Sequence, residues 1–258
     1  MALIFDSHSH YDNPRFDEDR DALLSSMPSK GVGLILSAGS SIKSSRQNSA
    51  LSKKYPFVFA SAGIHPIDCI NQTEPYLDEL REMLTENKKL VAVGEIGLDY
   101  HYDTSPPEMQ KKFLEEQLSL AKELNKPVII HSREATADML AILKEFRPKG
   151  VVHCFSGSCE TAREVLDLGM YIGFTGVVTF SNAQKAKKSA AYVPIDRLLI
   201  ETDCPYMAPV PYRGQRCDSS MLYSVADVLS QIKGVTRDEI LDATYKNAIK
   251  VFEMEALI

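Results

Sequence analysis

The stretch "LIFDSHSH", residues 3–10, begins as a short apolar run and ends in two histidines, His8 and His10. Side chains two residues apart on a β-strand point to the same face, so the two imidazoles are expected to lie together at the end of a strand. The whole chain of 258 residues has only six histidines. Two of them at one strand end indicate a site, and the other members of that site should end similar runs.

Apolar runs of this kind recur along the chain. They are "LIFDSHSH" (3–10), "VGLILSAG" (32–39), "VFASAGIH" (58–65), "VAVGEIGLD" (91–99), "PVIIHSR" (127–133), "GVVHCFSG" (150–157), "YIGFTG" (171–176) and "LLIETDCPY" (198–206). The segments between them have helical periodicity, as in residues 107–125 and 135–146. Near-continuous apolar strands that alternate with helices indicate a parallel sheet covered by helices. Eight such units in about 250 residues predict an α/β fold of the (β/α)8 TIM-barrel type.

The chain is expected to form a single domain over residues 1–258, because no linker, low-complexity stretch or shift in composition divides it. A doubly wound open sheet is the alternative architecture. No G-x-G-x-x-G follows any of the apolar runs, and this absence argues against the dinucleotide-binding version of that fold.

The composition is that of an ordinary globular protein, with 44% hydrophobic and 25% charged residues. A net charge of −6 gives no general attraction for nucleic acid, so a polyanion would be held by local groups or by bound metal. The five cysteines form no C-x-x-C pair, which is typical of reduced thiols. With no signal peptide or membrane span visible, we expect a cytoplasmic protein with no membrane attachment and no obligate protein partner.

Polar side chains end five of the apolar runs, on the face that period-two spacing assigns to the preceding apolar residues. Val91 and Val93 are expected to share a face with Glu95, and Glu201 is expected to share one with Asp203. In a barrel the apolar residues would fill the interior and the polar ones would line the C-terminal mouth, where barrel active sites lie. The residues placed there are His8, His10, Glu95, His131, His153 and Asp203.

Imidazoles and carboxylates without a thiolate suit Zn²⁺, Mn²⁺ or Mg²⁺, and the sequence does not choose among them. Six ligands exceed one tetrahedral site and fit two divalent cations that share a bridging carboxylate. Two cations about 3.5–4 Å apart can clamp a substrate oxygen and lower the pKa of a bound water to near 7, which is machinery for hydrolysis. Each residue alone could instead be a hydrogen-bonded core histidine or a paired acid. The joint placement of six favours a metal centre.

Five further residues are candidates with two interpretations each. Glu201 either orients metal ligands from one layer deeper in the barrel or belongs to a structural hydrogen-bond network. His65 either contacts substrate or caps the loop that follows it, and His101 lies either in a loop over the site or on the surface without a role. Arg213 and Arg216, in a Pro- and Gly-rich loop after the last run, either bind phosphate through their guanidinium groups or are solvated.

The chain resembles the TatD family of metal-dependent hydrolases, a branch of the amidohydrolase-like barrels usually described as TatD-type deoxyribonucleases. The motifs that carry the resemblance are, in order, "DSHSH", "GIHP", "AVGEIGLDY", "VIIHSR", "HCFSG" and "ETDCPYMAPVPYRG". They extend from residue 4 to the "YKNAIKVF" near residue 252, so the resemblance covers essentially the whole chain.

The resemblance implies a deoxyribonuclease that hydrolyses phosphodiester bonds at short or single-stranded DNA ends, as a 3'-5' exonuclease. It implies two divalent cations, with Glu95 bridging them and Asp203 accepting the proton of the attacking water as the second catalytic carboxylate. The residues that it assigns to one cation are His8, His10 and Asp203, and those that it assigns to the other are His131 and His153. The residues that it places near the scissile phosphate are His65, His101, Arg213 and Arg216.

Two positions depart from the family pattern. Ser9 stands where the family often has cysteine, a harmless change if that side chain points away from the metals. The loop "RGQRCDSS" has Cys217 in place of the usual asparagine and no following proline. Because this loop lies beside the expected phosphate contacts, the change bears on substrate specificity more than on catalysis.

Two other classes of function remain open beside the nuclease. The same centre could hydrolyse a carbonyl bond, such as an aminoacyl-tRNA ester, a lactone or an amide, since the same Lewis acid and hydroxide serve that chemistry. A non-catalytic scaffold that keeps its metals for stability is the third class. The six intact candidate ligands argue against the scaffold.

Overall fold

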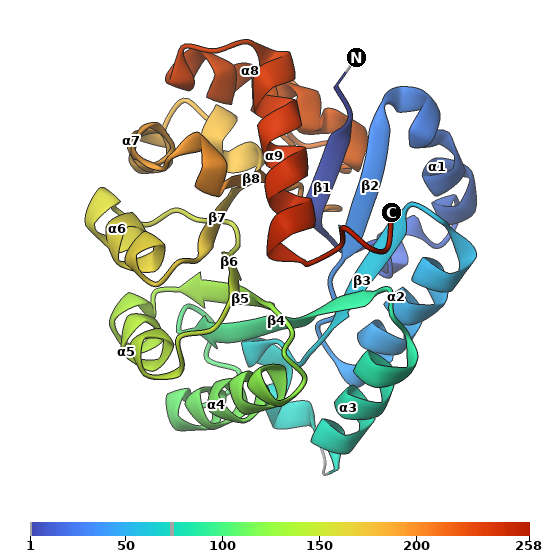
Figure 1. Ribbon diagram of the computed structural model, residues 1–258, viewed down its shortest axis with the longest axis vertical. Helices are drawn as coiled ribbons and strands as arrows, with labels where there is room; N and C mark the ends of the chain where they lie inside the picture. The colour runs from blue at the N-terminus through green and yellow to red at the C-terminus, as the bar shows by residue number, and fades with distance from the viewer. Residues whose placement is uncertain (1, 73–74) are drawn as a thin grey trace.

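The computed structural model describes residues 2–72 and 75–258. Eight parallel strands follow one another around a single sheet in the order β1 to β8, and the sheet curls into a barrel (Figure 1). The strands are β1 (Ile4–Ser9), β2 (Val32–Ser37), β3 (Val58–Ala62), β4 (Leu90–Asp99), β5 (Val128–Arg133), β6 (Gly150–Val152), β7 (Tyr171–Phe174) and β8 (Leu198–Ile200). The predicted (β/α)8 TIM barrel is therefore confirmed.

Helices cover the outside of the barrel (Figure 1). They are α1 (Arg20–Ser26), α2 (Ile42–Lys54), α3 (Tyr76–Glu86), α4 (Pro107–Glu123), α5 (Thr136–Phe146), α6 (Cys159–Asp167), α7 (Gln184–Tyr192), α8 (Leu222–Lys233) and α9 (Arg237–Val251). The helices predicted over 107–125 and 135–146 are α4 and α5. The start of α4 has a proline at its first helical position, where the missing N–H costs nothing.

The barrel closes between its last and first strands just beyond the end of β8. The backbone N–H of Asp203 donates to the carbonyl oxygen of His8 at 3.0 Å, and that of His10 donates to Cys204 at 2.9 Å. Buried polar backbone groups need such partners. Their pairing here fixes the segment after β8 against the segment after β1, so that two groups of candidate site residues lie side by side.

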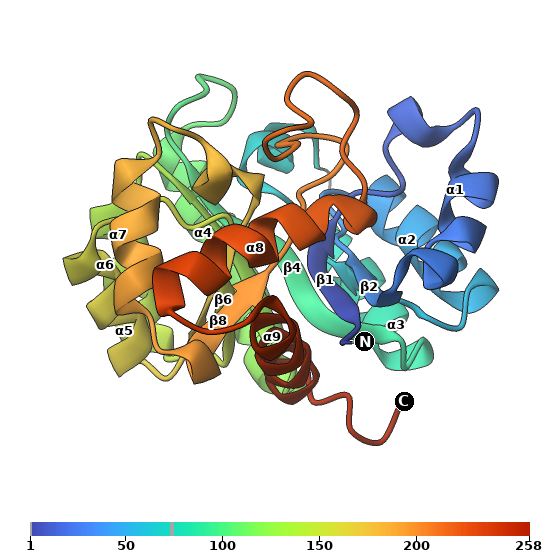
Figure 2. The same cartoon turned by 90° about the horizontal axis from the view of Figure 1, so that it is seen from above.

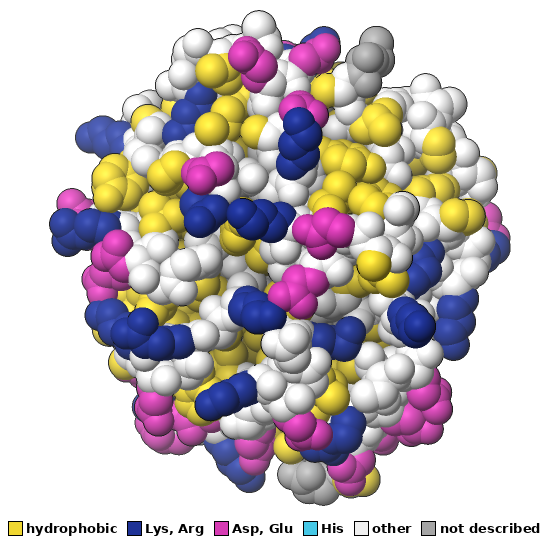
Figure 3. Space-filling model, viewed as in Figure 1, with side chains coloured by type: hydrophobic (Ala, Val, Ile, Leu, Met, Phe, Trp, Pro, Cys, Tyr) yellow, Lys and Arg dark blue, Asp and Glu magenta, His cyan; other side chains and the backbone are white. Residues whose placement is uncertain are grey.

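The interior of the barrel is apolar at the end opposite the mouth. Phe5, Val91 and Leu199 belong to a buried cluster that also includes Phe252 and Met254, which follow α9. Helix α9 therefore closes this end, and the long loop after β8 lies at the other (Figure 2). Lys, Arg, Asp and Glu side chains are interspersed over the closed end (Figure 3). The open end is left for chemistry, as in barrels generally.

The expected alignment of Val93 with Val91 and Glu95 is wrong. Val91 belongs to the inner cluster, whereas Val93 packs in the outer cluster between the sheet and its helices. The pairing of β4 with β5 shifts register between Val93 and Ile96, and this shift turns Glu95 into the mouth. A Cβ atom on Gly94 would lie 2.7 Å from Cβ of Ile129, so the backbone can pass there only without a side chain.

Strand β1 breaks the period-two pattern in the same way. Ile4 packs in the outer cluster and Phe5 in the inner one, so strict alternation would point His8 outward with Ile4. The register of β1 against β2 shifts between Asp6 and Ser9. His8 lies within this shift and faces into the mouth, whereas the carboxylate of Asp6 accepts hydrogen bonds from Thr202.

Among the residues described, no helix is both long enough and apolar enough to cross a membrane. The single-domain organisation of residues 1–258 stays a prediction, and its residues 1, 73 and 74 lie outside the described part of the chain.

Candidate metal centre

The six side chains expected at the strand ends meet in the mouth of the barrel. β1, β4 and β5 carry His8, Glu95 and His131, respectively. His10 and His153 directly follow β1 and β6, and Asp203 lies three residues beyond the end of β8. His8 and Glu95 are almost fully buried, while 16% of the Asp203 side chain is exposed toward solvent. The site is thus closed below and open at the mouth.

The carboxylate of Glu95 divides these side chains into two groups, one at each of its oxygens. Its Oε2 lies 3.3 Å from Nε2 of His8 and 3.5 Å from Nε2 of His10. Its Oε1 lies 2.9 Å from Nδ1 of His131 and 2.7 Å from Nε2 of His153. Oδ1 of Asp203 joins the first group, 3.2 Å from Nε2 of His10. The geometry is that of one carboxylate shared by two donor sets.

Pairs of imidazole nitrogens face each other within both groups. Nε2 of His8 is 3.1 Å from Nε2 of His10, and Nδ1 of His131 is 3.1 Å from Nε2 of His153. Two nitrogens bound to one tetrahedral cation at 2.0–2.1 Å are separated by roughly 3.3 Å. The donor sets therefore fit a divalent cation in each group by both chemistry and spacing.

Charge on the imidazoles compensates the acids in the metal-free site. Burial alone would raise the pKa of Glu95, but His153, His65 and His8 outweigh it and hold that pKa well below its usual range. Burial would lower the pKa of His10, but the hydrogen bond to Asp203 and the charge of Glu95 raise it to about 10. The raised pKa favours a proton on the imidazole of His10 at neutral pH.

Cation binding should release these protons. Burial opposes charge on His131 too, but hydrogen bonds to Asp99 and Glu95 raise its pKa to about 9. The pKa values of His10 and His131 lie above the value of about 6.5 for an unfolded chain. Protonation of these two imidazoles therefore adds to the free energy of unfolding of the metal-free protein, and this contribution is complete below about pH 6.5. This contribution is lost as the pH rises through 9 to 10.

The pKa of His153 is raised as well. We therefore expect at least two protons released per protein on loading at pH 7.5, and an affinity for cations that increases with pH. Calorimetric titration with Zn²⁺ in buffers of different ionisation enthalpy measures this release. An observed binding heat that is the same in all buffers would contradict it.

The second ring nitrogens of two of the imidazoles are held by hydrogen bonds. Nε2 of His131 lies 3.1 Å from Oδ2 of Asp99, and Nδ1 of His10 lies 3.2 Å from the carbonyl oxygen of Ala38. Such partners fix the ring orientation of a metal-binding histidine and raise its basicity. Sequence reasoning missed Asp99, which is 1% exposed. The signal was present, since Asp99 lies four residues beyond Glu95 on the same strand.

Replacing Asp99 with Asn should weaken cation binding by roughly 10- to 100-fold, because the amide carries no charge to support His131. The affinity can be measured by competition with a chelating dye. Asp103→Asn is the matched control, because Asp103 is an exposed carboxylate in the loop that follows. Equal affinities for the two variants would show that Asp99 does not support the site.

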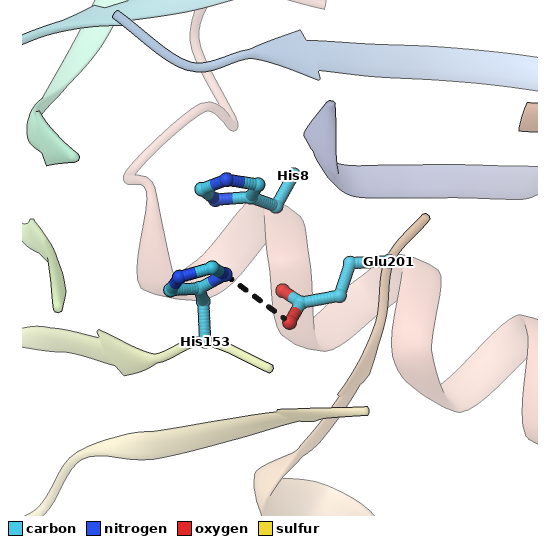
Figure 4. A group of neighbouring side chains, drawn as sticks. All are labelled: His8, His153 and Glu201. Atoms are coloured by element: carbon cyan, nitrogen blue, oxygen red, sulfur yellow. Dashed lines mark ion pairs between the residues drawn. The ribbon is translucent and has the colours of Figure 1, made fainter. Parts of the chain in front are cut away.

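Glu201 is fully buried, and its carboxylate points toward the imidazole of His153, with that of His8 nearby (Figure 4). Those two rings stack with centroids 4.0 Å apart, and their buried Nδ1 atoms have no hydrogen-bond partner among the described residues. Oε1 of Glu201 lies 3.8 Å from Nδ1 of His153 and accepts from the backbone N–H of Cys154. Burial raises the pKa of Glu201 to about 7. Both interpretations of Glu201, ligand orientation and structural bonding, keep a physical basis.

His65 combines its two expected roles. Its Nδ1 accepts a hydrogen bond from the backbone N–H of Ile67 at 3.2 Å, which caps the following turn. Its Nε2 lies 3.5 Å from Oε1 of Glu95. Burial lowers the pKa of His65, so its ring is neutral and carries its hydrogen on Nε2. The ring therefore presents a donor to the mouth.

The other predicted substrate contacts stand farther from the centre. His101 is 41% exposed by side chain, with Nδ1 2.7 Å from Oε1 of Glu134. The Arg216 guanidinium donates to both carboxylate oxygens of Asp19, at 2.8 and 2.5 Å. The guanidinium carbon of Arg213 lies 3.9 Å from the ring centroid of Phe180. Neither arginine is simply solvated, and contact of these residues with substrate stays a prediction.

The model of the TatD-related DNase family matches residues 5–253 of the chain. This chain belongs to the TatD family. The uncharacterized metal-dependent hydrolase YabD of Bacillus subtilis is 40% identical over 255 residues, which are 98% of this chain and 100% of that protein. A Cronobacter sakazakii protein named 3'-5' ssDNA/RNA exonuclease TatD is 33% identical, over 96% of this chain and 97% of its own length.

The crystal structure of YjjV, a TatD homologue from Escherichia coli K12, superposes with a TM-score of 0.92 at 35% identity. The match covers 97% of this chain and 98% of YjjV. Membership of the TatD family, together with the histidine and glutamate clusters in the mouth, identifies a metal-dependent hydrolase of the TIM-barrel type.

Proposed function

We propose that this TatD-family hydrolase cleaves phosphodiester bonds of DNA with two divalent cations and removes nucleotides from single-stranded ends. The division of donors around Glu95 carries the proposal, with histidines at 2.7–3.5 Å from each carboxylate oxygen. The relative from Cronobacter sakazakii, named as a 3'-5' exonuclease, supports a nucleic-acid substrate and a 3'-5' direction.

Two donor sets would hold the cations, with Glu95 common to both. The first set comprises His8, His10 and Asp203, and the second comprises His131 and His153. Bound divalent cations would activate water and polarise the phosphate, which raises the rate of hydrolysis at neutral pH.

The chain's own groups would position the substrate and move the proton. The partly exposed carboxylate of Asp203 would take the proton of the attacking water. Nε2–H of His65 would donate to a phosphate oxygen, because its Nδ1 already accepts from the backbone. His101 and the arginines Arg213 and Arg216 would contact the neighbouring nucleotides.

Cleavage of a 5'-labelled single-stranded oligonucleotide with Mg²⁺ or Mn²⁺ tests the proposal. We expect a ladder of products shortened from the 3' end, and no products from a Glu95→Ala/His131→Ala double variant. Asp103→Asn should cut as the wild type does. If the protein loads two cations but cuts no DNA, the phosphodiester assignment is overturned, and ester and amide substrates become the ones to assay.

A further inference from the structure

Two tyrosines stand exposed in the loops around the mouth. The exposed fractions of Tyr102 and Tyr206 are 47% and 48%. Tyr102 lies three residues beyond Asp99, which holds His131, and Tyr206 lies three residues beyond Asp203. Both rings are therefore close in sequence to side chains of the metal centre. Exposed aromatic rings at a site entrance offer flat faces on which the ring of a ligand can stack.

Each of these rings is held in place by its neighbours. The guanidinium carbon of Arg133 lies 5.0 Å from the ring centroid of Tyr102, and the His101 ring meets Tyr102 edge-on at 4.9 Å. We call Tyr102 with Arg133 the first platform. Cation–π contact and edge packing fix an aromatic ring without covering both of its faces. The first platform is thus a rigid surface that is still open to a ligand.

The second platform, Tyr206 with Arg15, has the same construction. The guanidinium carbon of Arg15 lies 5.7 Å from the ring centroid of Tyr206. Nδ2 of Asn13 donates to the tyrosine hydroxyl at 3.1 Å. The loops after β8 and β1 therefore build this platform together, as the loop after β4 and the end of β5 build the first.

The two platforms lie on opposite sides of the barrel mouth. Strands run in sequence order around the sheet, so β4 and β5 stand across from β8 and β1. The loops after β4 and β8 both rise at the open end (Figure 2). The donor sets around Glu95 lie between them, since one comes from β1 and β8 and the other from β5 and β6. A chain crossing the mouth would meet one platform on each side of the centre.

We propose that the two platforms stack nucleobases on either side of the phosphate being cleaved. This inference rests on the proposed nuclease function. Stacking on aromatic side chains tolerates any base, because every base has a π-face. It requires bases whose faces are free, so the platforms would select unpaired strands, and the two arginines would add attraction for the neighbouring phosphates.

The test compares two substrates with the same phosphates. One is fluorescein-labelled dT8, and the other is an eight-unit abasic strand of the same charge. We measure KM and kcat for both with Tyr102→Ala, Tyr206→Ala and the two Tyr→Phe variants. Tyr192→Ala is the matched control, because Tyr192 is also 47% exposed but ends α7, at the far end of the barrel.

We expect each Tyr→Ala change at a platform to raise KM for dT8 by roughly 10-fold or more. KM for the abasic strand should not change, and the Phe variants and Tyr192→Ala should behave as the wild type. Equal losses on both strands, or none on either, would overturn base stacking.

Fluorescence anisotropy of the labelled strands separates this result from failure of the nuclease function. If the wild-type protein binds dT8 but cuts nothing, the nuclease function is refuted. The Kd values of the variants for the two strands then test base stacking. Wild type that neither binds nor cuts dT8 overturns both proposals.

Discussion

Replacing Glu95 with Gln should abolish turnover almost completely, by on the order of 10³-fold or more. The amide keeps the shape of the side chain but loses the negative charge of the carboxylate, whose two oxygens each face imidazoles. Because both donor sets share this carboxylate, we expect the variant to retain fewer than two cations per chain. Metal content by mass spectrometry and steady-state rates on a single-stranded oligonucleotide measure the two effects.

Glu160→Gln is the matched control for this change, since Glu160 is an exposed acid in the first turn of α6. It should keep both cations and the wild-type rate. A Glu95→Gln protein with two tightly bound cations and more than about a tenth of the wild-type rate would refute the bridging role.

Replacing Asp203 with Asn should lower kcat by about 10²- to 10⁴-fold, the range for loss of a general base. The amide oxygen can still face His10, from which Oδ1 of Asp203 lies 3.2 Å, but it cannot take up a proton. Cation content should therefore fall less than in Glu95→Gln, so the two variants separate bridging from proton transfer. The kcat of the variant at saturating cation, measured beside its metal content, is the sharpest readout.

Burial alone would raise the pKa of Asp203, but interactions with His10, His8 and His153 outweigh it and hold that pKa below its usual range, so the carboxylate stays charged and able to take a proton at neutral pH. Folded Asp203→Asn protein with its cations in place and a normal kcat would assign the proton to another group.

The fold can be predicted from the sequence because the same pattern, an apolar run followed by a helical segment, is repeated along the chain. Eight apolar runs with helices between them leave few arrangements other than a barrel, and small errors at any one run do not change the count. The position of the candidate site can be predicted for the same reason, because residues at the C-terminal ends of the strands lie together at the mouth of a barrel. His131 and His153 are the clearest cases, since each continues the inward face of its strand beyond Ile129 and Val151.

Local backbone irregularities limit what period-two reasoning can do. His8 and Glu95 face the centre where β1 and β4 shift register against their neighbours, so strict alternation does not predict their direction. Gly94 marks one of these places, as a glycine inside a strand often does. Nothing in the sequence pattern of residues 3–10 marks the other.

Pairing between distant side chains is the second limit. The hydrogen bond of Arg216 to Asp19 joins residues that are 197 positions apart in the sequence, and no local sequence pattern predicts it. Asp99 had a local signal but stood outside the ring of expected ligands, because its role is to hold His131 rather than to face the centre.

A crystal structure of the protein grown with Mn²⁺, with anomalous differences collected at the manganese edge, would locate the cations of the shared centre. We predict two peaks per chain, one among His8, His10 and Asp203 and one between His131 and His153, with Glu95 contacting both. A single peak, or two peaks that do not share Glu95, would contradict this prediction.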